Sequence, residues 1–409
     1  MGKISKVKIT KMGKKICVDF QTTSDLDFFW REKNFFSEYD DFVESVPDSI
    51  AIIPFVCSVL PIVWLTDTEL EIETIDKAFY ESIEFFKRGY KKMYPQLSFN
   101  GTLTVDRVEY NFYQSEKSAM FFSGGADAYA SLVAHYDEQP VLMLLRGADV
   151  DLDDDLGWYN VSTSVECAAN EFGFLKSFIV SNFRSSLNQT ALDHFVAKSG
   201  DSWWHGFQHG IALIGQAAPL AFLHKFGVVY IASSFTKKDK EHEGFSCASD
   251  PTIDNYVRFG STIVSHDQFE FCRQEKITHI CNFVKKTGHK VSLHVCWRSK
   301  GGENCCHCEK CYRTIMEIAA ENMDPIEFGF ACDKNIYKRI KKDICLNMNV
   351  PFTSFWQEIQ DRFRENRSLF EKDKDFRWIY SIKVKNINRF PLKRLKSFFH
   401  KSKVSLFGR

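Results

Sequence analysis

The stretch whose residue types are best suited to bind an anion is Ser-Gly-Gly-Ala-Asp at residues 123–127. Apolar residues lead into it and an amphipathic stretch follows, which predicts a buried strand, a tight loop and a helix. Gly124 and Gly125 let a ligand approach the backbone N–H groups, and a helix N-terminus favours anions. Ser123 adds a hydroxyl, and Asp127 could orient a metal ion or cap the helix. We therefore expect a phosphate-binding loop, with an ordinary strand-to-helix turn as the alternative; neither a dinucleotide fingerprint nor a Walker loop is present.

A second stretch has the residue types and spacing of a metal site. It contains four cysteines in the pattern C-x8-C-x2-C-x2-C, namely Cys296, Cys305, Cys308 and Cys311. Short Cys-x-x-Cys turns can direct thiolates toward one ion, and four thiolates complete a tetrahedral Zn²⁺ site. Such a closed site leaves no position for a water molecule, so its expected role is structural. An iron–sulfur cluster is the main alternative, and a redox-active cysteine pair is another.

The elements that position these residues follow an alternating pattern from residue 118 onward. Strands are expected at 118–122, 140–145, 177–181 and 228–233, and helices at 127–136, 159–171 and 204–225. This alternation predicts an α/β fold built on a doubly wound parallel sheet. Ligands of such sheets bind at the C-terminal ends of the strands, so functional residues are expected just after each strand.

Several polar residues follow these strands. Arg184 follows the third strand, and Ser233 and Ser234 follow the fourth. Arg273 lies near the start of a helix expected at 269–285. An arginine at this edge could bind a phosphate or a carboxylate, although exposed cations usually contact only water.

Other candidates have weaker signals. The acidic run 149–155 is either a Mg²⁺ site or a solvated loop, and His205 and His209 either contact a substrate or pack. The charged segment 237–243 and the Ser-rich stretch after it form either a mobile lid or a surface insertion.

The flanking regions predict two further units. Residues 1–115 indicate a β-rich or α+β domain, in which the apolar run 50–65 is expected to form two buried segments around a turn. Residues 116–320 would form the catalytic domain, and 321–409 a helical C-terminal region. The tail from 381 onward carries nine Lys or Arg and no Asp or Glu, which suits either contact with nucleic acid or a solvated terminus.

Composition limits the classes of function. Hydrophobic residues make up 44% of the chain, charged residues 26%, and the formal net charge is zero, which argues against general binding to polyanions. The sequence shows no export signal and no apolar run long enough to span a bilayer. Thirteen cysteines in a chain of 409 residues without such a signal suggest reduced thiols and a metal, so we expect a cytoplasmic protein without a membrane partner.

Ser123, Gly124, Gly125 and Asp127 resemble the SGGxDS signature of the PP-loop ATP pyrophosphatases, with Ala128 where that family usually has serine. Together with the cysteine spacing, this signature resembles the QueC family, the 7-cyano-7-deazaguanine synthases, over residues 117–315 approximately. The resemblance implies an adenine nucleotide alpha-hydrolase (HUP-like) fold. The long extensions on both sides resemble those of QueC-like proteins of anti-phage defence and surface-polysaccharide loci.

The resemblance also implies an activity, that of an AMP-forming ligase of the C–N bond-forming type that uses ATP and Mg²⁺. Such an enzyme adenylates a carboxylate, here 7-carboxy-7-deazaguanine or a related acid, and releases pyrophosphate and then AMP. The acceptor would be ammonia or an amine of a partner protein. Ser123 and the two glycines would hold pyrophosphate, Asp127 would place Mg²⁺, and Arg184 or Arg273 would offset charge at the α-phosphate. Ser233 and Ser234 lie where that family binds its substrate, and Arg273 stands where it usually has a lysine.

Two other classes of function remain open. In tRNA thiolation, PP-loop enzymes adenylate a base oxygen and a cysteine delivers sulfur, for which Cys247 or Cys306 and the basic tail would serve. The other class is a catalytically silent scaffold that binds a nucleotide or a partner protein. Ala128 is the one mild sequence hint of it.

Overall fold

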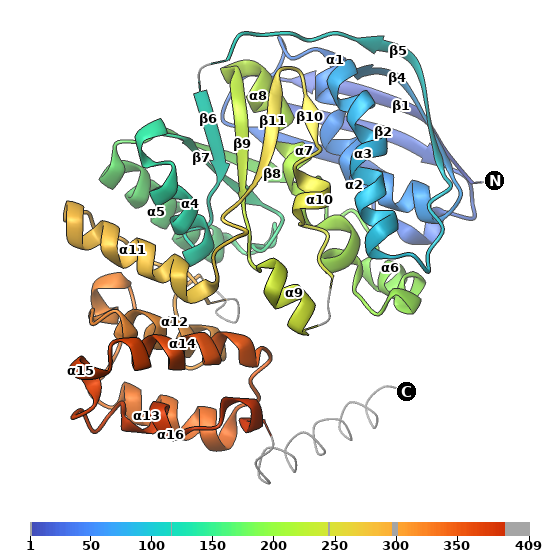
Figure 1. Cartoon of the computed structure of the whole chain (residues 1–409). Coiled ribbons are helices and arrows are strands. Elements are labelled where there is room, and N and C mark those ends of the chain that lie inside the picture. The colour runs from blue at the N-terminus through green and yellow to red at the C-terminus, as the bar shows by residue number, and fades with distance from the viewer. Residues whose placement is uncertain (1, 116, 244–245, 297–301, 389–409) are drawn as a thin grey trace.

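The computed structural model describes residues 2–115, 117–243, 246–296 and 302–388. These residues form an α/β structure around one eleven-stranded mixed sheet with the order β10-β11-β9-β6-β7-β8-β3-β2-β1-β4-β5 (Figure 1). The strands are β1 Lys3–Met12, β2 Lys15–Thr22, β3 Asn34–Tyr39, β4 Glu69–Asp76, β5 Thr102–Glu109, β6 Lys117–Phe121, β7 Val141–Arg146, β8 Lys176–Ser181, β9 Phe226–Ala232, β10 Arg258–Phe259 and β11 Thr262–Asp267.

Five neighbouring strands form a parallel core. β11, β9, β6, β7 and β8 pair in parallel. Numbered along the chain from β6, their spatial order is 3-2-1-4-5, which is the order of the first five strands of a doubly wound nucleotide-binding sheet. The strand order reverses between β6 and β9, and ligands of such sheets bind at this switch point. The predicted α/β class is confirmed, and the complete sheet is mixed rather than purely parallel.

Helices cover both faces of this parallel core. Neighbouring residues of β6 belong to two different hydrophobic cores. Ala119 belongs to the core that contains α2 and α7, whereas Met120 belongs to the core that contains α4, α5 and α11. The α-helices are α1 Asp48–Ala51, α2 Ile53–Leu65, α3 Lys77–Met93, α4 Ala126–Ala134, α5 Asp155–Phe172, α6 Gln189–Phe195, α7 Ile211–Gln216, α8 Ala218–His224, α9 Lys237–Glu243, α10 Pro251–Asp254, α11 Arg273–Thr287, α12 Glu309–Ala320, α13 Ile336–Lys342, α14 Thr353–Glu365, α15 Arg367–Phe370 and α16 Arg377–Ser381.

The N-terminal region extends the same sheet. β3 pairs antiparallel with β8, and β2, β1, β4 and β5 follow outward. Residue 115 therefore does not mark a break in the sheet. The apolar run 50–65 lies mostly in one buried helix, α2, instead of two segments around a turn, because Pro54 falls in its first turn, where no hydrogen bond is lost, and Pro61 is accommodated in its interior.

The C-terminal region is helical, as expected. α12 and α14 pack against α11 and against each other, so this region lies beside α11 and away from the N-terminal strands (Figure 1). The helix expected at 204–225 is divided into a π-turn, Trp204–Gln208, followed by α7 and α8. Most of the basic tail, residues 389–409, lies outside the described residues.

Candidate functional site

The predicted loop joins β6 to α4. Gly124 has φ +73°, a left-handed conformation that favours glycine, and the N–H of Tyr129 donates to Gly125 O at 2.9 Å in the first turn of α4. Ser123 is exposed. The backbone N–H of His294 donates to Gly124 O at 2.7 Å, so the segment that leads to the cysteines contacts this loop directly.

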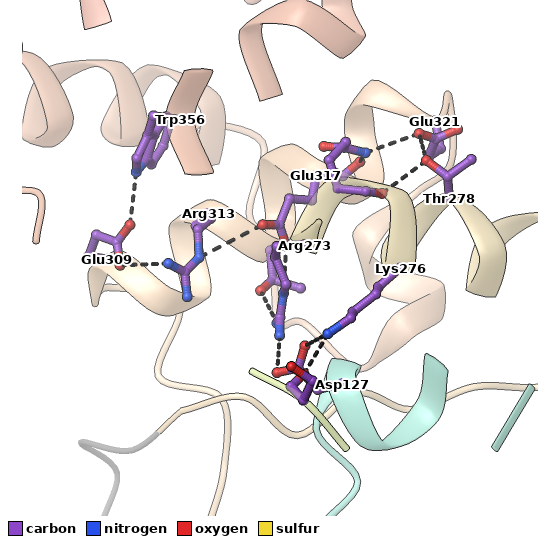
Figure 2. Close-up of polar contacts among 12 residues, drawn as sticks. Asp127, Arg273, Lys276, Thr278, Glu309, Arg313, Glu317, Glu321 and Trp356 are labelled. Carbon is purple, nitrogen blue, oxygen red and sulfur yellow. Dashed lines mark hydrogen bonds and ion pairs between the residues drawn. The ribbon is translucent and has the colours of Figure 1, made fainter. Parts of the chain in front are cut away.

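Asp127 is the meeting point of three parts of the chain (Figure 2). Arg273 Nη1 of α11 lies 2.7 Å from Asp127 Oδ2, and Lys276 Nζ lies 3.4 Å from Oδ1. The same Lys276 Nζ donates to Ser233 O after β9, at 2.5 Å. The Arg273 and Lys276 side chains are only 4% and 1% exposed, which excludes the interpretation of these residues as cations that contact only water. The contacts link the ends of β6 and β9, the two strands at the switch point.

These cations determine the charge state of Asp127. Burial would raise the pKa of its carboxyl group, but Arg273, Lys276 and Lys310 hold that pKa below its ordinary value. Burial and the neighbouring Arg273 guanidinium lower the pKa of Lys310. Asp127 is therefore ionised at neutral pH, as a carboxylate must be to bind a cation.

α12 supplies residues that the sequence did not single out. Glu309, Arg313 and Glu317 are spaced four residues apart on α12 and so share one helix face. Arg313 Nε lies 3.8 Å from Glu317 Oε1, Arg313 Nη1 lies 3.9 Å from Glu309 Oε2, and Arg273 Nε lies 3.4 Å from Glu317 Oε2 (Figure 2). The i, i+4 spacing could have revealed this charged face, but not its position beside Asp127.

Two of these charged groups are incompletely satisfied. Burial raises the pKa of Glu317, which is fully inaccessible to solvent, although Arg273 and Arg313 oppose the rise. Arg313 Nε and Nη1 have no hydrogen-bond partner within the described part of the chain, since their carboxylate neighbours lie beyond hydrogen-bond distance. The guanidinium group is held by stacking over Phe355, 4.2 Å from the ring centroid. An anion nearby would supply compensating charge.

A cavity of about 290 Å³ opens between these groups. One part of its wall is charged and contains Asp127, Arg273, Glu309, Lys310 and Arg313; the remainder is formed by Ser234, Phe235, Met348, Asn349, Pro351, Phe352 and Phe355. The ring centroids of Phe235, Phe352 and Phe355 lie 5.6–6.0 Å from one another, within the range of favourable ring contacts. The cavity thus offers a charged side and an aromatic side.

The four predicted cysteines form one cluster. The Sγ atoms of Cys296, Cys305, Cys308 and Cys311 all lie within 4.8 Å of one another. Two of the separations are 3.8 Å (Cys296–Cys308) and 3.9 Å (Cys305–Cys311). A tetrahedron with Zn–S bonds of about 2.3 Å has edges of ~3.8 Å, so the thiols fit zinc. Among the described residues, no other group of three or more His, Cys, Asp or Glu side chains is close enough together to hold a metal.

The cysteine cluster adjoins the loop and the cavity. Cys308 is the N-cap residue of α12, and its Sγ accepts from the Cys311 N–H at 3.4 Å. The first two turns of α12 carry Lys310 and Arg313 to the cavity wall. A metal held by these thiols would therefore fix the start of the helix that supplies two of the cavity's cations.

Arg184 lies elsewhere. It lines a second cavity, of about 350 Å³, together with Arg31, Asp151 and Asp153. Its Nη1 donates to Ala148 O at 2.7 Å, and its guanidinium lies 4.2 Å from the centroid of the Trp204 ring. The structure thus brings together the predicted residues Asp127, Ser233, Ser234 and Arg273, with the loop glycines adjacent, and places Arg184 in a separate cavity.

The acidic run mostly makes local contacts. Asp154 caps α5 by accepting from the Gly157 N–H at 2.8 Å, and Asp155 lies 2.5 Å from Arg146 Nη2. These two carboxylates serve the protein rather than a metal.

Glu358 provides a test of the electrostatics around the cavity. Burial, together with the Asp239 and Glu317 carboxylates, raises its pKa to about 7 from 4.5, so the folded state favours the protonated form. The resulting stabilisation is present at acidic pH and is lost as pH rises from about 4.5 through 7. In the wild type this loss is at most about 3 kcal/mol of the free energy of unfolding. We expect the Glu358→Gln substitution to remove most of it. Thermal unfolding of the wild type and the variant at pH 5 and pH 8 measures the difference. An equal fall in stability between these pH values in both proteins would contradict the prediction.

Comparison with protein-family models, with curated proteins and with solved structures finds no match. Within the described ranges, no helix combines the length and apolarity needed to cross a bilayer. The arguments about function therefore depend on the site itself.

Proposed function

We propose that this chain is a QueC-like, AMP-forming enzyme that adenylates a carboxylic acid and transfers the acyl group to nitrogen. The observation that carries the proposal is the convergence, at the switch point of the parallel sheet, of the Ser-Gly-Gly loop with Asp127 and its buried cations. The cysteine cluster directly adjacent to this loop is a second supporting observation.

The cavity has the two chemical surfaces that the proposed substrates require. Arg273, Lys310 and Arg313 would offset the negative charge of a polyphosphate, and the exposed Ser123 hydroxyl and the loop N–H groups would bind the departing pyrophosphate. Phe235, Phe352 and Phe355 would contact the face of a planar base, either adenine or a deazaguanine.

The chemistry asked of the protein is mainly orientation and charge stabilisation. Asp127 would hold Mg²⁺, which would supply positive charge to offset that of the phosphate groups. The acid's carboxylate oxygen attacks the α-phosphorus, the bond to pyrophosphate breaks, and an acyl adenylate forms. Arg273, already 2.7 Å from Asp127, would lie beside the charge that develops at the α-phosphate.

The acid would be 7-carboxy-7-deazaguanine or a related compound, and the acceptor ammonia or an amine of a partner protein. The N-terminal strands and C-terminal helices, which a minimal adenylating domain does not need, support a protein partner. The setting that we propose is anti-phage defence.

The product formed from ATP tests the proposal. The protein is incubated with ATP, Mg²⁺ and 7-carboxy-7-deazaguanine, and nucleotides are separated by chromatography. We expect AMP and pyrophosphate that depend on the acid. Formation of ADP, or ATP binding without any AMP across a panel of carboxylic acids, would contradict the proposal, and the second result would favour a nucleotide-binding scaffold.

A further inference from the structure

A second reactive cluster lies outside the Asp127 cavity. Cys247, in the segment that connects β9 to β10, has its Sγ 3.8 Å from His209 Nδ1. His205 also interacts with this thiol, and its Nδ1 lies 2.9 Å from Asp201 Oδ1. Tyr94 OH donates to the other Asp201 oxygen at 2.9 Å. A thiol, two imidazoles and an orienting carboxylate are the components of a cysteine nucleophile.

The backbone fixes this arrangement. The N–H of Ala248 donates to His205 O at 2.8 Å, which holds the cysteine segment against the π-turn that contains His205 and is followed directly by His209. From the other side, Lys240 Nζ lies 2.6 Å from Asp250 Oδ2. Cys247 as a whole residue is 5% exposed, so the protein largely shields it from solvent.

Charge favours the thiolate. Burial would raise the pKa of Cys247, but His205 and His209 lower it to about 5. Hydrogen bonds to Asp201 and Cys247 raise the pKa of His205 to about 10, so this imidazole stays protonated. The other ionisable groups around the thiol are Tyr90 of α3 and Tyr94, the C-cap residue of that helix, with Asp254 and Asp149 acting on His209. Both tyrosines are neutral because their pKa values are raised.

The cluster and the Asp127 cavity share a charged neighbour. The Asp149 carboxylate acts electrostatically both on His209 and on Lys310, which lines that cavity. The segment that carries Cys247 begins after Ser234, another residue of the cavity wall. The connection from β9 to β10 therefore contributes both to the cavity wall and to the nucleophile.

We propose that Cys247 accepts the acyl group from the acyl adenylate as a thioester and then passes it to the amine, with His205, His209 and Asp201 as its activating groups. The proposal rests on the proposed function for its acyl donor. The thiolate attacks the carbonyl carbon, a C–S bond forms, and the C–O bond to AMP breaks, with AMP leaving with the electron pair. The amine then attacks the thioester, a C–N bond forms, the C–S bond breaks with its electron pair returning to the Cys247 thiolate, and the proton released by the amine passes to solvent.

The first experiment measures the thiolate without any nucleotide. The folded protein is treated briefly with iodoacetamide at pH 4–9, and alkylation at each cysteine is quantified by peptide mass spectrometry. Cys247 should be modified with a midpoint near pH 5. The buried Cys281, whose pKa burial raises to about 12, is the internal control and should remain unmodified at pH 7. The His205→Gln and His209→Gln variants should move the Cys247 midpoint upward; an unchanged midpoint in both would overturn the activating role of the histidines.

The second experiment traps the acyl group. Wild-type and Cys247→Ala proteins receive either ATP, Mg²⁺ and 7-carboxy-7-deazaguanine or a chemically prepared acyl adenylate of that acid, without amine. We expect one acyl adduct per wild-type chain by intact mass, removable by hydroxylamine and absent from the variant. Cys167→Ala, which alters an exposed cysteine, should keep the adduct.

The two donors separate the two hypotheses. An adduct from the acyl adenylate but no AMP from ATP would contradict the proposed function and support the nucleophile. AMP from ATP with no adduct from either donor, together with transfer to amine by Cys247→Ala at the wild-type rate, would overturn the nucleophile and leave the proposed function intact. No adduct and no AMP would overturn both.

Discussion

The Asp127→Asn protein is expected to form AMP on the order of 10²–10³-fold more slowly than the wild type, because it loses a carboxylate that lies beside the loop and contacts the buried cations. The amide keeps the shape of the side chain but supplies neither the charge that binds Mg²⁺ nor the charge that orients Arg273. Steady-state rates of AMP formation at saturating ATP and acid measure the effect. Asp153→Asn, in the separate Arg184 cavity, is a matched control and should stay within about twofold of the wild type.

Loss of folding must be separated from loss of chemistry. Asp127 neutralises Arg273 and Lys276, both almost fully buried, and removing one partner of a buried ion pair costs about 3–5 kcal/mol. Asp127→Asn combined with Lys276→Met removes one charge of each sign and should regain much of the lost stability while remaining inactive. An active double variant, or an Asp127→Asn protein with normal turnover, would refute the assignment of this site.

The Cys308→Ser protein is expected to lose its bound metal and to be largely insoluble. Cys308 is both a member of the four-thiol cluster and the N-cap residue of α12, so the substitution removes a ligand at the point where the helix begins. Binding of a structural metal contributes directly to folding free energy. Metal content by mass spectrometry of purified protein and the yield of soluble protein are the measurements.

Cys306→Ser is the matched control for this prediction. Cys306 lies two residues before Cys308 and is also buried, but it is not one of the four clustered thiols. It should retain one metal per chain. If Cys306→Ser lost the metal and Cys308→Ser kept it, the ligand set would be wrong. A bound metal other than zinc, with iron and inorganic sulfide, would identify a cluster instead.

The features that could be predicted from sequence are those encoded by local spacing. The Ser-Gly-Gly turn depends on a few neighbouring residues, and Cys296, Cys305, Cys308 and Cys311 are close enough in the chain for spacing alone to bring them together. The alternation of strands and helices from residue 118 similarly predicted the parallel core, since each buried strand is a short apolar run.

The features that could not be predicted depend on contacts between distant segments. Asp127 and Arg273 are 146 residues apart, and nothing local indicates that the first turn of α11 ends beside the loop. The charged face of α12 has ordinary helical spacing, and only tertiary packing makes Glu317 fully buried. Arg184 does follow a strand of the parallel core, as predicted. Its side chain, however, stacks on Trp204 and lines a cavity separate from that of Asp127.

The continuity of the sheet has a consequence for how the chain can be divided. β8 is the last strand of the parallel core, and β3 covers its outer edge. The two strands pair antiparallel, with Ser37 opposite Ser181. A fragment that began at residue 117 would present β8 as an open edge, with unpaired backbone groups flanked by apolar residues, which is a template for self-association. The N-terminal strands therefore protect the edge of the parallel core from self-association within the same chain.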